Sequence, residues 1–302
     1  MNTASNETIP ALKVTLLLIV GLITFGIAPI LVRYATDVDP FVLAAMRTGF
    51  AVLILIPFWL PKRATIDTLK KNGVKMWWLA AAGVCLGLHF SFWIGSLHYT
   101  SVASASVLVT MHPVMLIVAE SLIFKKNFRP LVWAGVVLSF LGSALLGLAD
   151  ESSLDQFPQA LLGNSLAFTA AVIFVAYFMI GRKIRQIAEW IDYVFYVYLY
   201  ATITCIFLAL IWIGGIPYIS VTAIIVGFAL AAGPTIIGHG SINYAVKYIS
   251  PTLLATLVLS EAIFAAIAAY FLFGEIPSSF SLGAMVVILT GVALTWTRRL
   301  VR

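Results

Sequence analysis

Long apolar runs, separated by short polar or charged breaks, extend over nearly the whole chain. Each run has about 20 residues, the length that an α-helix needs to cross the hydrocarbon core of a bilayer. The breaks contain helix-ending residues, as at 37–40 and 274–277. The pattern predicts ten membrane-spanning helices and no separate soluble domain. Their expected bounds are 11–33, 40–60, 74–97, 101–124, 130–149, 160–181, 190–213, 220–245, 250–273 and 279–297.

The composition agrees with a membrane location. Of the 302 residues, 10% are charged, against roughly 25% in a typical soluble domain, and 62% are hydrophobic. The mean hydropathy is +1.06. A soluble protein of this size would need far more charge on its surface. These values exclude a soluble globular protein and leave lipid as the solvent.

The basic residues lie almost entirely on one side of the expected topology. When alternate loops are assigned to opposite sides, all Lys and Arg residues except Arg33 and Arg47 fall with the two termini. The positive-inside rule then places both termini in the cytoplasm. We therefore expect a multi-pass protein of a bacterial inner (plasma) membrane. The net charge of +6 is a topology signal and does not indicate nucleic-acid binding.

The two halves of the chain are related by a shift of 149 positions, which superposes the first five expected helices on the last five. The shift aligns Phe25 with Phe174, Arg33 with Arg182, Tyr99 with Tyr248, Ser101 with Ser250, Phe124 with Phe273 and Gly142 with Gly291. Because five is odd, the second copy must enter the membrane from the opposite side. The sequence thus predicts an all-α membrane protein of two inverted five-helix repeats, residues 1–149 and 150–302. Inverted repeats are typical of secondary transporters.

Three short segments carry a resemblance to a known family. The fourth expected helix contains Thr-Met-His-Pro at 110–113, and the ninth contains Leu-Ser-Glu-Ala at 259–262 and runs at its end into Leu-Phe-Gly-Glu at 272–275. With ten helices in two copies, these segments resemble the EamA family of the drug/metabolite transporter superfamily. The resemblance implies a basket of ten helices around a central cavity, with the fifth and tenth at the periphery. It also implies transport of amino acids or other small metabolites, outward in many members. The family often has Pro after the ninth-helix Glu, where this chain has Ala262.

Ionisable side chains inside the expected helices are candidate transport residues, because a charge in lipid is costly. These residues are Arg47, His89, His98, His112, Glu120, His239 and Glu261. Glu261 lies near mid-depth, and the repeat places it opposite His112. We expect Glu261 to hold a substrate ammonium group or to exchange a proton, unless it is a structural carboxylate bonded to a neighbouring helix. His112 is either a proton-sensitive gate or a neutral histidine beside a kink.

Other polar side chains form stripes on helix faces. His89 and Trp93 are one turn apart in the third expected helix, and His239 and Asn243 form a similar stripe in the eighth, where Gly-Pro at 233–234 should bend the helix. Such stripes line a cavity or bind another helix. The histidines give no metal-site spacing, so no metal is expected.

Three further side chains are candidates for substrate contact. Arg47 attracts a substrate carboxylate, pairs with Asp37 or Asp39, or reaches the outer lipid headgroups. Tyr196 and Tyr200 stack on an apolar substrate, or they pack in the protein core.

Two prolines mark helices that can act as gates. Pro29 lies in the first expected helix and Pro113 in the fourth, and each interrupts helical hydrogen bonding. Glu120, on the same helix as Pro113, is expected to form a structural ion pair with Lys125.

These features favour a secondary transporter that works by alternating access. We expect an exporter of amino acids or related amphipathic compounds, with protons as a candidate coupling ion. The chain has no Gly-Lys-Ser/Thr nucleotide motif and no zinc-protease or serine-nucleophile motif, so we expect no enzyme and no cofactor. The alternatives are a membrane-embedded enzyme or a channel, and cationic drugs or nucleoside-like metabolites as substrates. The expected partners are a small-molecule substrate and the lipid bilayer, without nucleic acid, and the sequence is compatible with a monomer.

Overall fold

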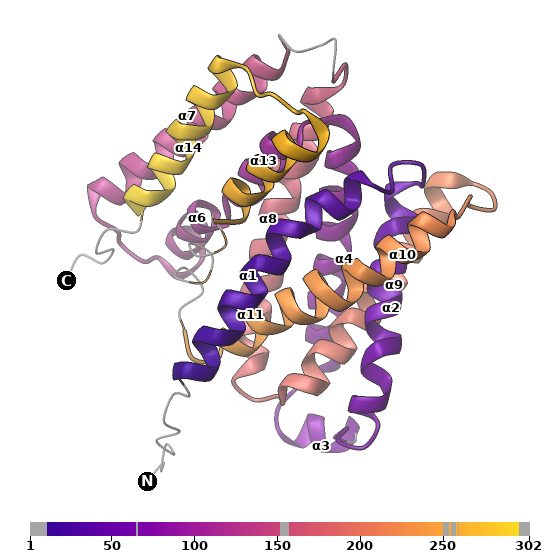
Figure 1. The fold of residues 1–302 in the computed structure, drawn as a ribbon. Helices are drawn as coiled ribbons and strands as arrows, with labels where there is room; N and C mark the ends of the chain where they lie inside the picture. The colour runs from indigo at the N-terminus through magenta and orange to yellow at the C-terminus, as the bar shows by residue number, and fades with distance from the viewer. Residues whose placement is uncertain are drawn as a thin grey trace.

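The structure, a computed structural model, describes residues 11–64, 66–151, 157–249, 254, 258 and 260–295. These residues form helices joined by turns and short connections (Figure 1). The helices are α1 (Ala11–Arg33), α2 (Pro40–Trp59), α3 (Ile66–Lys71), α4 (Met76–Tyr99), α5 (Val102–Val109), α6 (His112–Phe124), α7 (Pro130–Glu151), α8 (Ala160–Arg185), α9 (Trp190–Ile213), α10 (Val221–Leu230), the π-helix η1 (Ala231–His239), α11 (Gly240–Ala245), α13 (Ser260–Phe273) and α14 (Ser279–Thr295). The predicted all-helical fold class is confirmed for the described residues.

Several helical stretches are long and apolar enough to cross a bilayer. Seven such stretches occur among the described residues: Leu12–Arg33, Pro40–Trp59, Met76–Tyr99, Val102–Ile123, Ala160–Arg185, Trp190–Ile213 and Val221–Ala245. Two shorter apolar stretches, Pro130–Gly142 and Ser279–Leu294, lie within the fifth and tenth expected spans, and α13 lies within the ninth. Large apolar side chains such as Leu122 and Phe271 are exposed, as contact with lipid requires. The chain is therefore a multi-pass membrane protein.

The fourth expected span consists of two helices. The helix breaks at Thr110 and Met111, between α5 and α6, and Pro113 lies in the first turn of α6. The predicted kink at Pro113 is thus a full break one turn earlier. The reason is that Pro113 has no N–H to donate to the carbonyl of Val109, and its ring crowds the preceding turn. The Thr110 hydroxyl instead bonds back to the carbonyl of Ser106 at 2.7 Å.

The eighth expected span changes its winding at the predicted Gly-Pro bend. Pro234 lies inside η1, where the chain follows a π-helix. Pro234 cannot donate to the carbonyl of Leu230, and the Thr235 hydroxyl donates to that carbonyl instead, at 2.9 Å. A Tyr198 hydroxyl from α9 donates to the carbonyl of Thr235 at 2.8 Å. The π-helix therefore has its displaced backbone groups satisfied by side chains.

Helices α7 and α14 lie side by side at one edge of the molecule (Figure 1). Their close approach depends on two glycines. A Cβ on Gly142 would lie 2.9 Å from the backbone nitrogen of Ile288, and one on Gly291 would lie 2.6 Å from that of Ser139. The 149-residue shift exchanges these two contacts, and Ser139 donates a hydrogen bond to the carbonyl of Ile288 at 3.3 Å. The pair lies at the periphery, where the resemblance had placed it.

The remaining long helices form the body of the bundle. Helix α4 packs against α8 and α9, α2 packs against α9, and α1 packs against η1 and α13. Gly83 and Gly87 of α4 face α9, where a Cβ on Gly83 would lie 2.7 Å from the carbonyl oxygen of Val197. These contacts gather the seven helices named here into one bundle.

Two helix ends 149 residues apart have the same geometry. Lys125 ends α6 with a φ of 52°, and Gly274 follows α13 with a φ of 65°, both in the left-handed region. The amide of Lys126 donates to the carbonyl of Glu120, and the amide of Glu275 donates to that of Ala269, each bond spanning six residues. Each end thus combines one left-handed residue with a bond from the next amide back over the last turns of the helix. The shift found in the sequence is thus repeated in local backbone structure.

Candidate functional site

A small cavity lies at the centre of the bundle. Its lining is aromatic and aliphatic apart from one arginine and three histidines. The lining residues are Phe25, Ala28, Arg47, His89, Phe90, Trp93, Val109, His112, Phe174, His239, Ile242 and Val258. The free volume is about 30 Å³, room for one or two water molecules. In this conformation the side chains themselves fill most of the site.

The cavity lining is built from pairs of residues related by the 149-residue shift. These pairs are Phe25 with Phe174, Phe90 with His239, Trp93 with Ile242, and Val109 with Val258. Each pair takes one side chain from each half of the chain. The cavity therefore lies between the two halves, at equivalent depth in both.

Arg47 supplies the positive charge of the cavity. Its side chain is buried, with a relative exposure of 1%. The Nε atom donates to the Thr235 hydroxyl at 2.6 Å, and the guanidinium carbon lies 3.8 Å from the ring centre of Phe90. A hydroxyl on the π-helix and an aromatic face thus hold the guanidinium in place. Asp39, one of its expected partners, caps α2 by accepting from the amide of Phe41.

The three histidines surround Phe174 and lie close to one another. The ring centres of His89 and His112, and those of His89 and His239, are 6.2 Å apart. His89 Nδ1 lies 2.9 Å from the carbonyl oxygen of Ala170, whose acceptor role requires the proton on that nitrogen. Among the described residues, no group of three His, Cys, Asp or Glu side chains has metal-binding geometry.

Several polar atoms at the cavity have no hydrogen-bond partner within the described part of the chain. They are Trp93 Nε1, both ring nitrogens of His112 and His239 Nδ1. Each belongs to a side chain that is at most 5% exposed. Buried polar groups without partners are costly, so these atoms are available to bind a polar ligand or water.

Some predicted site residues lie outside the cavity. Asn243 accepts a hydrogen bond from the Tyr177 hydroxyl at 2.7 Å. Tyr196 packs edge-on against Trp59, and Tyr200 lies against Gly83. In this conformation, therefore, these three side chains pack between helices and do not line the cavity.

Two other predictions have different outcomes. Glu261 belongs to the first turn of α13, and its side chain lies outside the described residues. Pro29 lies within α1 without interrupting it.

The sequence reasoning missed the apolar half of the lining. Phe90, Val109 and Val258 give no polar signal in an apolar helix, so nothing in their residue type singled them out. Phe25 and Phe174 did give a signal, because the repeat aligns them, but an alignment of two phenylalanines does not show that they face a cavity.

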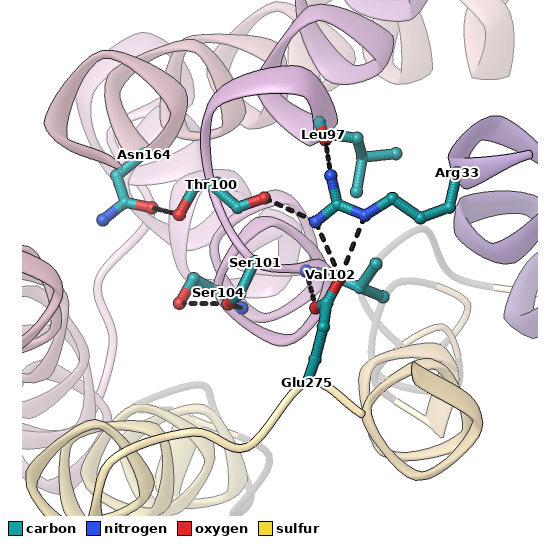
Figure 2. Close-up of polar contacts among 8 residues, drawn as sticks. All are labelled: Arg33, Leu97, Thr100, Ser101, Val102, Ser104, Asn164 and Glu275. Atoms are coloured by element: carbon teal, nitrogen blue, oxygen red, sulfur yellow. Dashed lines mark hydrogen bonds and ion pairs between the residues drawn. The ribbon is translucent and has the colours of Figure 1, made fainter. Parts of the chain in front are cut away.

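One end of the bundle is closed by an ion pair between the two halves of the chain (Figure 2). Arg33, at the end of α1, lies 2.8 Å from a carboxylate oxygen of Glu275. Arg33 also donates to the carbonyls of Leu97 and Thr100 at the end of α4. The second carboxylate oxygen of Glu275 accepts from the amide of Val102 at 2.8 Å. These contacts tie together α1, α4, α5 and the segment after α13.

A larger cavity, called here the basic vestibule, lies between the ends of α6, α8 and α11. It is lined by Leu116, Glu120, Lys126, Met179, Arg182, Lys183, Gln186 and Lys247. Its volume is about 620 Å³. Leu116 lies one helical turn from His112 on α6, so the vestibule continues toward the central cavity.

The expected partner of Glu120 is corrected by the structure. The Glu120 carboxylate lies 3.2 Å from Lys126 Nζ, and Lys126 replaces the predicted Lys125. The left-handed turn at Lys125 folds the following residue back over the helix end, which brings Lys126 within reach.

Comparison with known proteins agrees with this architecture. The model of the EamA-like transporter family matches residues 12–148 and 161–297, and each end of the second match lies 149 residues after that of the first. A protein named "Uncharacterized transporter" from Archaeoglobus fulgidus is 24% identical over 276 residues, which are 87% of this chain and 90% of that protein. A solved protein crystal structure is similar in fold, with a TM-score of 0.65 at 19% identity over 94% of this chain and 97% of that one. The chain belongs to the EamA-like transporter family of the drug/metabolite transporter superfamily.

Proposed function

We propose that this protein is a secondary transporter that carries small amphipathic metabolites across a bacterial inner membrane by alternating access. In this proposal, ten helices form two inverted repeats of five, and the central cavity is the substrate site. Both termini lie in the cytoplasm, so the basic vestibule opens to the cytoplasm and the Arg33–Glu275 pair closes the outer end.

The observation that carries the proposal is the paired lining of the central cavity. Four pairs of repeat-related residues face one point between the halves of the chain. Secondary transporters bind substrate at the interface of their repeats and expose it to either side as the repeats rock. A site formed equally by both halves is suited to this motion.

The two ends of the bundle support alternating access over a channel. The outer end is held shut by an ion pair and three further hydrogen bonds, whereas the vestibule at the other end is about 620 Å³ in volume. A channel requires one continuous pathway, and this structure is open at one end and closed at the other. It corresponds to the inward-facing state of the transport cycle.

The cavity residues suggest how substrate is held. Arg47 binds a carboxylate, the unpartnered nitrogens of Trp93 and His112 bind polar groups, and Phe90 and Phe174 contact an apolar body. Amino acids and related compounds have these groups, and export from the cytoplasm is the proposed direction.

Proton coupling is part of the proposal. It rests on His112 and on Glu261, which the repeat relates to it. One of these groups would bind a proton as substrate leaves.

Counterflow in proteoliposomes tests this function. Purified protein is reconstituted, loaded with one compound of a panel of amino acids, nucleosides and cationic drugs, and diluted into the same compound carrying a radiolabel. Transport by alternating access predicts saturable accumulation of label without ATP for at least one compound. A linear, non-saturating flux would indicate a channel, and no flux of any compound that binds the protein would contradict transport.

A further inference from the structure

The ion pair at the outer end has no counterpart at the vestibule. The 149-residue shift places Arg182 at the position of Arg33 and Lys126 at the position of Glu275. Both positions of the second pair therefore have positive charge. The amides of Lys126 and Glu275 make equivalent bonds, each to the carbonyl six residues earlier, and each follows a residue with positive φ, so the alignment holds in the local backbone.

The carboxylate of Glu275 makes two different contacts at the end of the bundle that the ion pair closes. One of its oxygens binds Arg33 at the end of α1, and the other accepts from the amide of Val102 at the start of α5. A single carboxylate of the second half thus joins two helices of the first half. At the vestibule Lys126 takes that position, and its ammonium group can neither pair with Arg182 nor accept a hydrogen bond from a backbone amide.

Most of the charged side chains that line the vestibule are positive. Four cations line it, Lys126, Arg182, Lys183 and Lys247, against the one carboxylate of Glu120, which is paired with Lys126. Lys183 lies over the ring of Trp78 at 5.2 Å, which fixes its position at the rim. Topology explains the sign of these charges, but it does not require four of them to face the same cavity.

We propose that the vestibule binds an anionic group, a phosphate or a carboxylate, between Arg182 and Lys126, and that this group replaces the carboxylate that Glu275 supplies at the other end. The anion offsets the repulsion between the cations and allows the vestibule end to close. This step rests on the alternating access proposed above. It makes the preferred substrate an anion, which enters through the vestibule and moves along α6 toward His112 and Arg47.

Binding is tested with inorganic phosphate. The protein is placed in nanodiscs of neutral phosphatidylcholine, and its thermal unfolding is followed as phosphate replaces chloride at constant ionic strength, which keeps screening fixed. We expect a saturable rise in the unfolding temperature of about 2–4 °C. Arg182→Gln should raise the half-saturating phosphate concentration by about tenfold or more. Lys71→Gln, which changes an exposed lysine of α3 outside the vestibule, should leave it unchanged.

The source of the anionic group is tested in the same assay. Nanodiscs with phosphatidylglycerol replace the neutral ones, without added phosphate. If this lipid raises the unfolding temperature of the wild type but not of Arg182→Gln, and abolishes the phosphate response, the anionic group is a lipid headgroup. If phosphate still acts, the group belongs to a soluble ligand.

Closure is tested by the reactivity of two cysteines, placed singly in a Cys85→Ala, Cys205→Ala background. Gln186→Cys reports on the vestibule and Val102→Cys on the outer end. Phosphate should slow labelling of the first and speed labelling of the second by a membrane-impermeant maleimide. Lys126→Glu, which supplies the missing carboxylate, should produce both changes without phosphate, whereas Lys71→Glu should produce neither.

The outcomes separate the two proposals. Slower labelling at position 186 without faster labelling at position 102 would support the anion site and contradict alternating access. A phosphate response that is absent, or equal in Arg182→Gln and the wild type, would overturn the anion site and leave the transport proposal standing.

Discussion

Arg33 and Glu275 are 242 residues apart in the chain and form an ion pair of 2.8 Å between the two halves of the molecule. Their side chains are 12% and 7% exposed. Because each charge is largely removed from solvent, removal of one partner leaves the other charge poorly compensated. The pair is therefore a candidate lock for this end of the bundle.

Glu275→Gln should unlock this end. We expect labelling of Val102→Cys, in a background without the native cysteines, to become faster by about tenfold, since the charge-assisted bonds to Arg33 and the Val102 amide weaken. The measurement is the rate of maleimide reaction in proteoliposomes. Glu189→Gln, an exposed carboxylate outside the site, is the matched control and should not change the rate. Equal rates in Glu275→Gln and the parent protein would show that the pair does not hold the end closed.

Packing between α7 and α14 depends on Gly291. A Cβ at this position would lie 2.4 Å from Ser139 Oγ and 2.6 Å from its backbone nitrogen, so Gly291→Ala must separate the helices. We expect a loss of stability of about 1–3 kcal/mol, measured by thermal or denaturant unfolding. Gly283 lies on the same helix with no heavy atom within 4 Å of the added Cβ. Gly283→Ala should therefore be neutral or slightly stabilising, and equal destabilisation by both substitutions would contradict this packing.

Substitutions at the two left-handed helix ends, Lys125 and Gly274, should change the stability of the protein in opposite directions. Lys125→Gly removes the steric cost of a positive φ and should stabilise the protein by about 0.5–1 kcal/mol. Gly274→Ala introduces that cost and should destabilise it by about 1 kcal/mol. Gly215→Ala, at an open position without positive φ, provides the control. Unfolding temperatures of the three variants test the prediction, which fails if Gly274→Ala and Gly215→Ala behave alike.

The bond between Arg47 and Thr235 positions the guanidinium in the cavity. Thr235→Val keeps the size of the side chain and removes the acceptor, so Arg47 should lose its orientation and counterflow should fall by about fivefold or more. Thr202→Val, on α9, removes a hydroxyl that bonds to the carbonyl of Tyr198 one turn back, outside the central cavity, and should retain transport. Normal counterflow in a folded Thr235→Val protein would exclude this positioning role.

Much of the fold follows from the sequence because lipid imposes simple rules. Apolar length, basic loops and the 149-residue shift predicted where helices lie, and the helix end at Lys125 matches that at Gly274 as the shift requires. What hydropathy could not reveal is the change of winding within a span. The break at Thr110 and the π-helix around Pro234 preserve the apolar pattern while they redirect the backbone.

The candidate site was predictable only in part. Arg47 and three histidines drew attention because an ionisable group is costly in lipid, and the structure brings them together around one cavity. Asn243 was predicted to line the cavity as part of the polar stripe with His239, yet it bonds to Tyr177 between helices. The spacing of polar residues shows which face of a helix they share, but not what that face packs against. A polar stripe that lines a cavity therefore cannot be distinguished in the sequence from one that contacts another helix.

The Arg33–Glu275 pair was missed for a related reason. Both residues lie at helix ends, where a charge has an ordinary explanation in topology. Their proximity depends on how the ends of α1, α4 and α13 meet, which the three-dimensional packing determines.

Counterflow with Val109→Trp tests the central claim most directly. Val109 lines the central cavity with its repeat mate Val258, and an indole there would occupy the free volume of about 30 Å³ and the space that substrate needs. Val84→Trp places the same group on an exposed, lipid-facing position of α4 and controls for the added bulk. We predict that a substrate transported by the wild type shows no counterflow in Val109→Trp and normal counterflow in Val84→Trp, with both proteins folded. Wild-type counterflow in Val109→Trp would contradict the placement of the substrate site.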